Sequence, residues 1–130
     1  MPYDNTTDAI LQIKSIFEDV TGIKVEVLWG NISKNYAPQI NKVITRIMQE
    51  ALTNSIRHGE ASYIQISFSE HYGKFSIAIT DNGKGSKQIV KGIGLTGMEE
   101  RLKTVNGELA ASTPPEGGFR LTVNIPIIKN

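Results

Sequence analysis

Cysteine is absent from this sequence of 130 residues, and histidine occurs only twice, at His58 and His71. Without cysteine the chain has no disulfide and no thiolate metal site, which fits a reducing compartment. Two isolated histidines make no histidine metal cluster, and no motif supports a serine, histidine and aspartate triad.

A long apolar run and a large net charge are also missing. No apolar run approaches the roughly 20 residues of a membrane span, and the polar start "MPYDNTTD" does not resemble a signal peptide. The formal net charge is +1, so charge gives no reason to expect a nucleic-acid partner or a membrane surface. We therefore expect a cytoplasmic protein, or the cytoplasmic part of a longer one.

Helical and strand patterns follow one another along the chain, with no repeat, low-complexity tract or obvious linker between them. Apolar residues at helical spacing predict three helices, at about 6–20, 38–59 and 96–106. Alternating apolar and polar residues predict five strands, at about 24–29, 63–69, 74–80, 108–112 and 120–125. We expect a single domain, residues 1–130, in which a mixed β-sheet is covered on one face by three helices, an α/β sandwich.

The first predicted helix would have Thr6 or Thr7 as its N-cap and would end at Gly22. Its expected buried face consists of Ile10, Ile13, Phe17 and Val20. The second predicted helix has the strongest pattern in the chain, with an apolar stripe of Ile40, Val43, Ile44, Ile47, Met48, Ala51 and Leu52.

Glu50 and Asn54 lie at the border of the apolar stripe on the second predicted helix. They are four residues apart and so share one face, about 40° from each other. A carboxylate at a half-buried border costs free energy unless something pairs with it. One interpretation is structural, with Glu50 paired to Arg46 or Arg57. The other is a hard-cation site, because Mg²⁺ prefers carboxylate or amide oxygens together with waters and substrate phosphates.

Asp81 ends an apolar strand pattern in the segment "TDNGKG" at 80–85. Asp-Asn-Gly favours an Asx turn, which is the structural interpretation. The functional interpretation is a buried carboxylate that accepts hydrogen bonds from a ligand amino group. Gly83 and Gly85 would then let the backbone approach a flat ring or adopt positive φ.

The segment "GIGLTGMEERL" at 92–102 places three glycines before or at the start of a predicted helix. Backbone N–H groups in such a segment can hold phosphates, helped by the helix N-terminus. A glycine cluster is weak evidence alone, and its spacing matches neither the Rossmann nor the Walker pattern. The combination is stronger, because the helix, the strand end and the glycine segment follow in one order within about 50 residues of the chain.

Together, "QEALTNSIRHG", "TDNGKG" and "GIGLTGMEERL" resemble the ATP-binding catalytic domain of bacterial sensor histidine kinases. That fold is shared with gyrase, Hsp90-type chaperones and mismatch-repair ATPases. "GLTGMEERL" followed by "NGEL" is similar to the subfamily that pairs with LuxR-type response regulators. The resemblance covers residues 8–127 and implies an ATP-dependent protein histidine kinase domain that uses ATP and Mg²⁺.

The resemblance also implies roles for the matched residues. Asn54 is similar to the family's magnesium-binding asparagine, and Asp81 to the aspartate that accepts the adenine amino group. Glu50 is similar to the family's catalytic acidic residue, which orients or deprotonates groups around the γ-phosphate. Further nucleotide-binding residues implied by the resemblance are Arg57, His58, Gly83, Gly85, Gly92, Gly94 and Met98. One departure is Phe119, which stands where many relatives carry a threonine that helps to hold the adenine.

No segment resembles the family's phosphoacceptor motif or its dimerising helical hairpin. The resemblance therefore implies a catalytic domain that acts on a histidine of a separate dimerisation domain and signals indirectly to a response regulator. It further implies a homodimeric, membrane-anchored parent protein and little autophosphorylation by this chain alone. Two alternatives on the same fold are an anti-sigma-factor-type serine kinase and a non-catalytic nucleotide-binding module.

Overall fold

The computed structural model describes residues 5–33, 35–59, 61–83, 95–115 and 117–127. Its helices are α1 (Thr6–Thr21), α2 (Pro38–Gly59) and α3 (Leu95–Lys103). Its strands are β1 (Lys24–Trp29), β2 (Tyr63–His71), β3 (Lys74–Asp81), β4 (Glu108–Ser112) and β5 (Phe119–Pro126). Among these residues, no helix combines the length and the apolar character that crossing a membrane requires.

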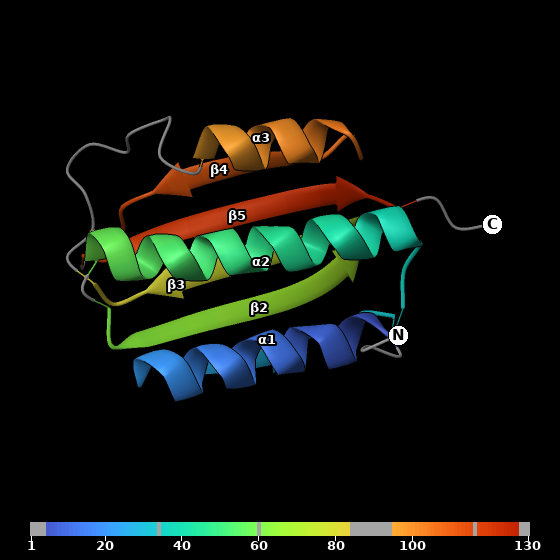
Figure 1. The fold of residues 1–130 in the computed structure, drawn as a ribbon. Helices are drawn as coiled ribbons and strands as arrows, with labels where there is room; N and C mark the ends of the chain where they lie inside the picture. Colours follow the sequence, from blue (N-terminus) through green and yellow to red (C-terminus); the bar gives the residue numbers. More distant parts are fainter. Residues whose placement is uncertain (1–4, 34, 60, 84–94, 116, 128–130) are drawn as a thin grey trace.

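The five strands form one mixed sheet in the order β1-β2-β3-β5-β4. The β1 and β2 strands are parallel, and the other neighbouring pairs are antiparallel. All three helices lie on the same face of this sheet (Figure 1), with α2 across its middle. The predicted α/β sandwich with helices on one face is therefore confirmed.

The core lies between the sheet and the helices. Alternation along β2 buries Ile64, Ile66 and Phe68, and their neighbours in the sequence are only partly buried. The same period buries every second residue of β3 and β5. The predicted stripe of α2 is buried against these strands except for Ile40, which is partly buried at the helix start. Because successive strand side chains alternate between faces, one face of the sheet is apolar and the other polar.

The N-cap of α1 and the exposure of Val20 near its end differ from the prediction. The N-cap is Asn5, whose side-chain Oδ1 accepts a hydrogen bond from the backbone N of Asp8 at 2.8 Å. Thr6 is instead buried, and its hydroxyl accepts a hydrogen bond from the backbone N of Tyr36. Val20, predicted to be buried, is 78% exposed. Helical spacing predicts which face is apolar, but it cannot predict how far along the helix neighbouring elements reach.

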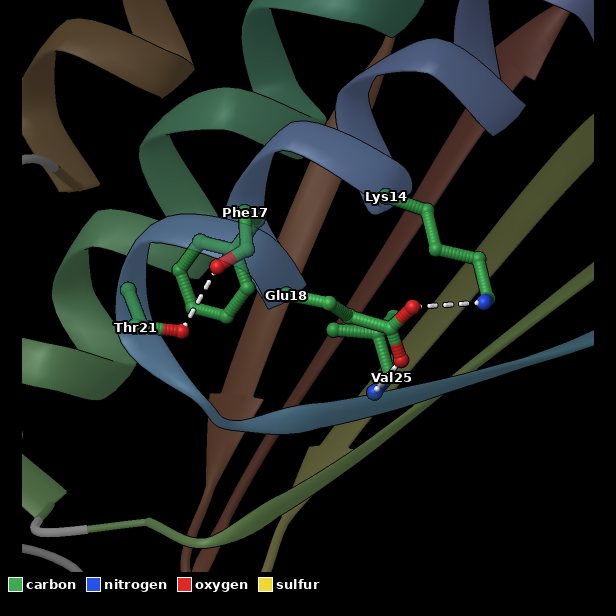
Figure 2. Close-up of polar contacts among 5 residues, drawn as sticks. All are labelled: Lys14, Phe17, Glu18, Thr21 and Val25. Atoms are coloured by element: carbon green, nitrogen blue, oxygen red, sulfur yellow. Dashed lines mark hydrogen bonds and ion pairs between the residues drawn. The ribbon is translucent and has the colours of Figure 1, made fainter.

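Glu18 joins the last turns of α1 to β1 (Figure 2). One of its carboxylate oxygens accepts from Lys14 Nζ at 2.8 Å, and the other accepts from the backbone N of Val25 at 2.8 Å. The hydrogen bond from Lys14, followed by the one from Val25, holds the pKa of Glu18 below its ordinary value. Gly22, at φ 75°, then ends α1 as predicted and turns the chain toward β1.

Two connections near the sheet differ from the prediction, one shorter and one longer. The β2–β3 hairpin turns at Tyr72 and Gly73 alone, both at positive φ, so β2 continues to His71 instead of ending at Ser69. The β3 strand begins at Lys74 as predicted. The α3 helix ends at Lys103 and is followed by a turn in which Asn106 has positive φ. The backbone N of Gly107 then donates to the carbonyl of Leu102 at 2.7 Å, which closes the helix end.

Candidate functional site

Asp81, the last residue of β3, is buried with 5% of its surface exposed. Its Oδ2 accepts from the hydroxyl of Ser55 on α2 at 3.1 Å, and its Oδ1 accepts from the backbone N of Gly83 at 2.9 Å. The bond to Gly83 is the Asx turn of the structural interpretation. Two carboxylate oxygens offer about four acceptor positions, so this carboxylate can accept further hydrogen bonds from a ligand.

Asn82 fixes the end of β3 against the start of β2. Its side-chain oxygen accepts from the backbone N of Ser62 at 2.9 Å and of Tyr63 at 3.0 Å. Its amide nitrogen donates to the Ser62 hydroxyl at 3.0 Å. Because all three bonds are made inside the protein, Asn82 is a structural residue that holds the neighbouring Asp81 in place.

Gly118 packs directly against the backbone of Asp81. It has φ 89°, and a Cβ at this position would lie 2.2 Å from the carbonyl oxygen of Asp81. No other residue fits here without moving the strand end, because both the positive φ and the close approach favour glycine. The sequence analysis did not single out Gly118, although the Gly117–Gly118 pair just before β5 was a visible signal.

Glu50, on α2, has two oxygens in different environments. Oε1 pairs with Arg101 Nη1 on α3 and lies 3.5 Å from Arg46 Nε on α2. Oε2 is buried and has no hydrogen-bond partner within the part of the chain that the structure describes. The predicted structural pairing with Arg46 is therefore present, but the main partner is Arg101, which the sequence analysis missed. A buried carboxylate oxygen without a partner is costly, and a bound ligand would offset that cost.

Asn54 lies one helical turn after Glu50 and is half-buried. Within the described residues its side chain makes no hydrogen bond, so its amide oxygen is available. The same residues contain no group of three histidine, cysteine or acidic side chains that could hold a metal ion. Mg²⁺ commonly keeps several waters and phosphate oxygens as ligands, and an amide oxygen is a ligand type that it accepts.

The described part of the site thus joins α2, the end of β3, the start of β5 and α3. Gly83 is half-buried and bonded to Asp81, and Phe119 pairs with Asp81 in the β3–β5 register. Met98 is fully buried in the hydrophobic core, and its predicted contact with nucleotide stays a prediction. The predictions for Gly85, Gly92 and Gly94, and for the side chains of Arg57 and His58, lie outside what the structure describes.

Known proteins are similar to this chain in sequence and in fold. The family model described as "Histidine kinase-, DNA gyrase B-, and HSP90-like ATPase" matches residues 40–129. The chain belongs to this ATPase family. The match includes the α2 segment, the end of β3 and α3, which carry the candidate site. The resemblance that rested on three short motifs is thereby confirmed.

Curated relatives of this ATPase-family chain are sensor kinases. The chain is 35% identical over 114 residues to the "Signal transduction histidine-protein kinase/phosphatase DegS" of Brevibacillus brevis, covering 85% of this chain and 30% of that protein. It is 32% identical over 124 residues to the "Sensor histidine kinase DesK" of Bacillus subtilis, covering 92% and 32% respectively. The chain therefore spans about a third of the length of these relatives.

Solved structures confirm the fold. The ATP-binding domain of PrrB from Mycobacterium tuberculosis superposes with a TM-score of 0.76 at 21% identity, covering 96% of each chain. A blue-light activated histidine kinase of Erythrobacter litoralis superposes with a TM-score of 0.77 at 20% identity, covering 91% of this chain and 40% of that one.

Proposed function

We propose that this chain binds Mg-ATP and supplies the γ-phosphoryl group to a histidine on the dimerisation domain of a sensor histidine kinase, for relay to a response regulator. The observation that carries the proposal is the buried Asp81 carboxylate, which retains acceptor capacity at the end of β3. Adenine presents an amino group that can donate to such a carboxylate. The relatives with sensor-kinase names favour this function over a serine kinase or a non-catalytic module.

Asp81, Asn54 and Glu50 each have a distinct part in the proposed reaction. Asp81 binds the adenine amino group, and Asn54 contributes its amide oxygen to Mg²⁺, which neutralises phosphate charge when bound. A ring nitrogen of the acceptor histidine attacks the γ-phosphorus, forming an N–P bond as the bond to the bridging oxygen breaks and ADP leaves. Glu50 Oε2, which has no hydrogen-bond partner among the described residues, accepts the proton from the other ring nitrogen.

The remaining contacts are proposed from the family match. Gly83, Gly85, Gly92 and Gly94 let the backbone lie close to the base and the phosphates, and Arg57, His58 and Met98 border the nucleotide. The parent protein is proposed to be a homodimer with a membrane anchor, and its catalytic domain to lie in the cytoplasm. Transfer requires an acceptor held in line with the γ-phosphate, so the chain alone should not phosphorylate itself.

The test is a chimera in which this chain replaces the matching segment of the Brevibacillus brevis kinase. After incubation with γ-labelled ATP, we expect acid-labile label on the chimera and none on the isolated chain. A Glu50→Gln chimera should bind ATP normally and label much more slowly. The proposal is wrong if the folded chimera stays unlabelled, or if the isolated chain becomes labelled on His58 or His71.

A further inference from the structure

Arg101 connects the two helices that border the candidate site. Its Nη1 pairs with Glu50 Oε1, and this contact ties α3 to α2. The other oxygen, Oε2, is buried and without a hydrogen-bond partner. One side of the carboxylate is therefore held by an arginine, while the other side is left for a group that the described residues do not supply.

Gly97 provides the space that this contact needs. It lies four residues before Arg101 on α3, and a Cβ placed on it would be 3.1 Å from Arg101 Nη1. Helical side chains point toward the N-terminus of their helix, over the residue one turn earlier. The arginine side chain thus lies across a residue with no side chain and reaches α2 from there. A glycine inside a helix costs up to about 1 kcal/mol relative to alanine, so a packing reason for it is expected.

A plainer role for Arg101 is interaction with the helix dipole, because it lies in the last turn of α3. That role is fulfilled by a side chain directed toward the C-terminal carbonyl groups. The guanidinium instead lies beside Gly97, in the first turns of α3, and contacts a residue of another helix. Lys103, in the same last turn, is exposed and fits the dipole role.

We propose that Arg101 is a positioning residue for phosphoryl transfer. It holds Glu50 by Oε1, so that Oε2 faces the reacting groups, and Gly97 leaves room for the guanidinium to do so. The proposal rests on the function proposed above. Arg46 contributes less, because its Nε lies 3.5 Å from the same oxygen and its side chain is 57% exposed.

The first test measures phosphorylation of the chimera and nucleotide affinity of the isolated chain. Arg101→Ala should lower the labelling rate at saturating ATP about tenfold, which corresponds to one lost charged contact. The affinity of a non-hydrolysable ATP analogue should change less than about twofold if nothing but Glu50 is disturbed. Arg101→Lys should recover part of the rate, and Lys103→Ala on the same helix should match the wild type.

A double-mutant cycle separates positioning from a general packing role. If Arg101 acts through Glu50, adding Arg101→Ala to Glu50→Gln should reduce the rate no further. A rate loss that adds to that of Glu50→Gln would contradict the proposal. A large loss of analogue affinity in Arg101→Ala would overturn it too, since that result means direct phosphate contact. A faster Arg101→Ala chimera would show that the ion pair restrains Glu50 rather than orienting it.

Gly97→Ala gives a second test, in which stability should be kept or raised while the labelling rate should fall. Alanine should stabilise α3, so the melting temperature should not fall. Its methyl group should displace the guanidinium by a few tenths of an ångström and slow labelling. A variant that is both stable and fully active would contradict the role assigned to Gly97.

A spectroscopic readout keeps this proposal separate from the proposed function. In NMR spectra of the isolated chain, the ¹³C chemical shift of the Glu50 carboxyl carbon should change in Arg101→Ala and stay the same in Lys103→Ala. If the wild-type chimera is unlabelled, the proposed function fails, and this signal alone decides whether Arg101 fixes Glu50. An unmoved signal would show that the arginine does not hold the carboxylate.

Discussion

Asp81→Asn should lose ATP affinity while the fold survives, and the contacts around Asp81 explain both outcomes. Gly83 donates to Oδ1, and Ser55 donates to Oδ2. In the variant, the asparagine oxygen can keep the bond from Gly83. Its NH₂ group then faces Ser55, whose hydroxyl can donate to the carbonyl of Ala51, 3.2 Å away, and accept from the new amide. Exchanging a charged bond for a neutral one should cost about 1 kcal/mol of stability.

The loss on the nucleotide side should be larger. A hydrogen bond to a charged group contributes about 1.5–3 kcal/mol, so affinity for an ATP analogue should fall roughly 10- to 150-fold. Guanine presents a carbonyl oxygen where adenine presents its amino group. The carboxylate repels that oxygen, whereas the NH₂ group of the variant can donate to it, so the preference for ATP over GTP should shrink.

Calorimetry with non-hydrolysable ATP and GTP analogues measures both quantities, and circular dichroism reports the melting temperature. Asp19→Asn, an exposed acid on α1, is the matched control and should bind like the wild type. If a folded Asp81→Asn variant keeps its affinity and its preference for ATP, Asp81 does not bind the base, and its role is the Asx turn alone.

The other predictions concern metal, backbone and pH. Asn54→Ala should weaken analogue binding in calorimetry more with Mg²⁺ than without it, and equal losses would contradict a metal role. Gly118→Ala should lower stability by about 1–3 kcal/mol in urea unfolding and also lower nucleotide affinity, because it displaces Asp81; a variant unchanged in both would show that the strand end adapts. The pKa of Glu18 is lower in the folded than in the unfolded chain, so its stabilising contribution is present above about pH 4.5 and disappears as pH falls through the folded value. Glu18→Gln should flatten that acid limb of stability, and an unchanged limb would refute the contribution.

Local patterns in the sequence were enough to predict the elements and their layers. The period of the apolar residues identified α2 and the strands, since side chains on one face of a helix or strand are buried together. The same reasoning failed at Val20, which has the right spacing but lacks neighbours to cover it. Whether a residue at the end of a helix is buried depends on how far the neighbouring elements extend in the tertiary structure. The periodicity of apolar residues contains no information about that extent.

The candidate site shows a similar division. Glu50, Asn54 and Asp81 could be proposed because they lie in motifs that follow one another in one order within about 50 residues and together resemble a known family. The contact partners of Arg101 and Gly118 could not be predicted, because each lies on an element far away in the sequence. The two interpretations of Asp81 also proved compatible, since the Asx turn leaves acceptor positions free. From the sequence alone, the two interpretations of Asp81 could only be stated as alternatives.

Binding of Mg-ATP at the site formed by α2, β3 and α3 underlies both the proposed phosphoryl transfer and the role proposed for Arg101. Calorimetry of the wild-type chain with a non-hydrolysable ATP analogue, in the presence and absence of Mg²⁺, tests this binding. We expect one site per chain, tighter binding with Mg²⁺, and much weaker binding of the GTP analogue. Absence of binding by the folded chain under both conditions, or equal binding of both nucleotides, would contradict it.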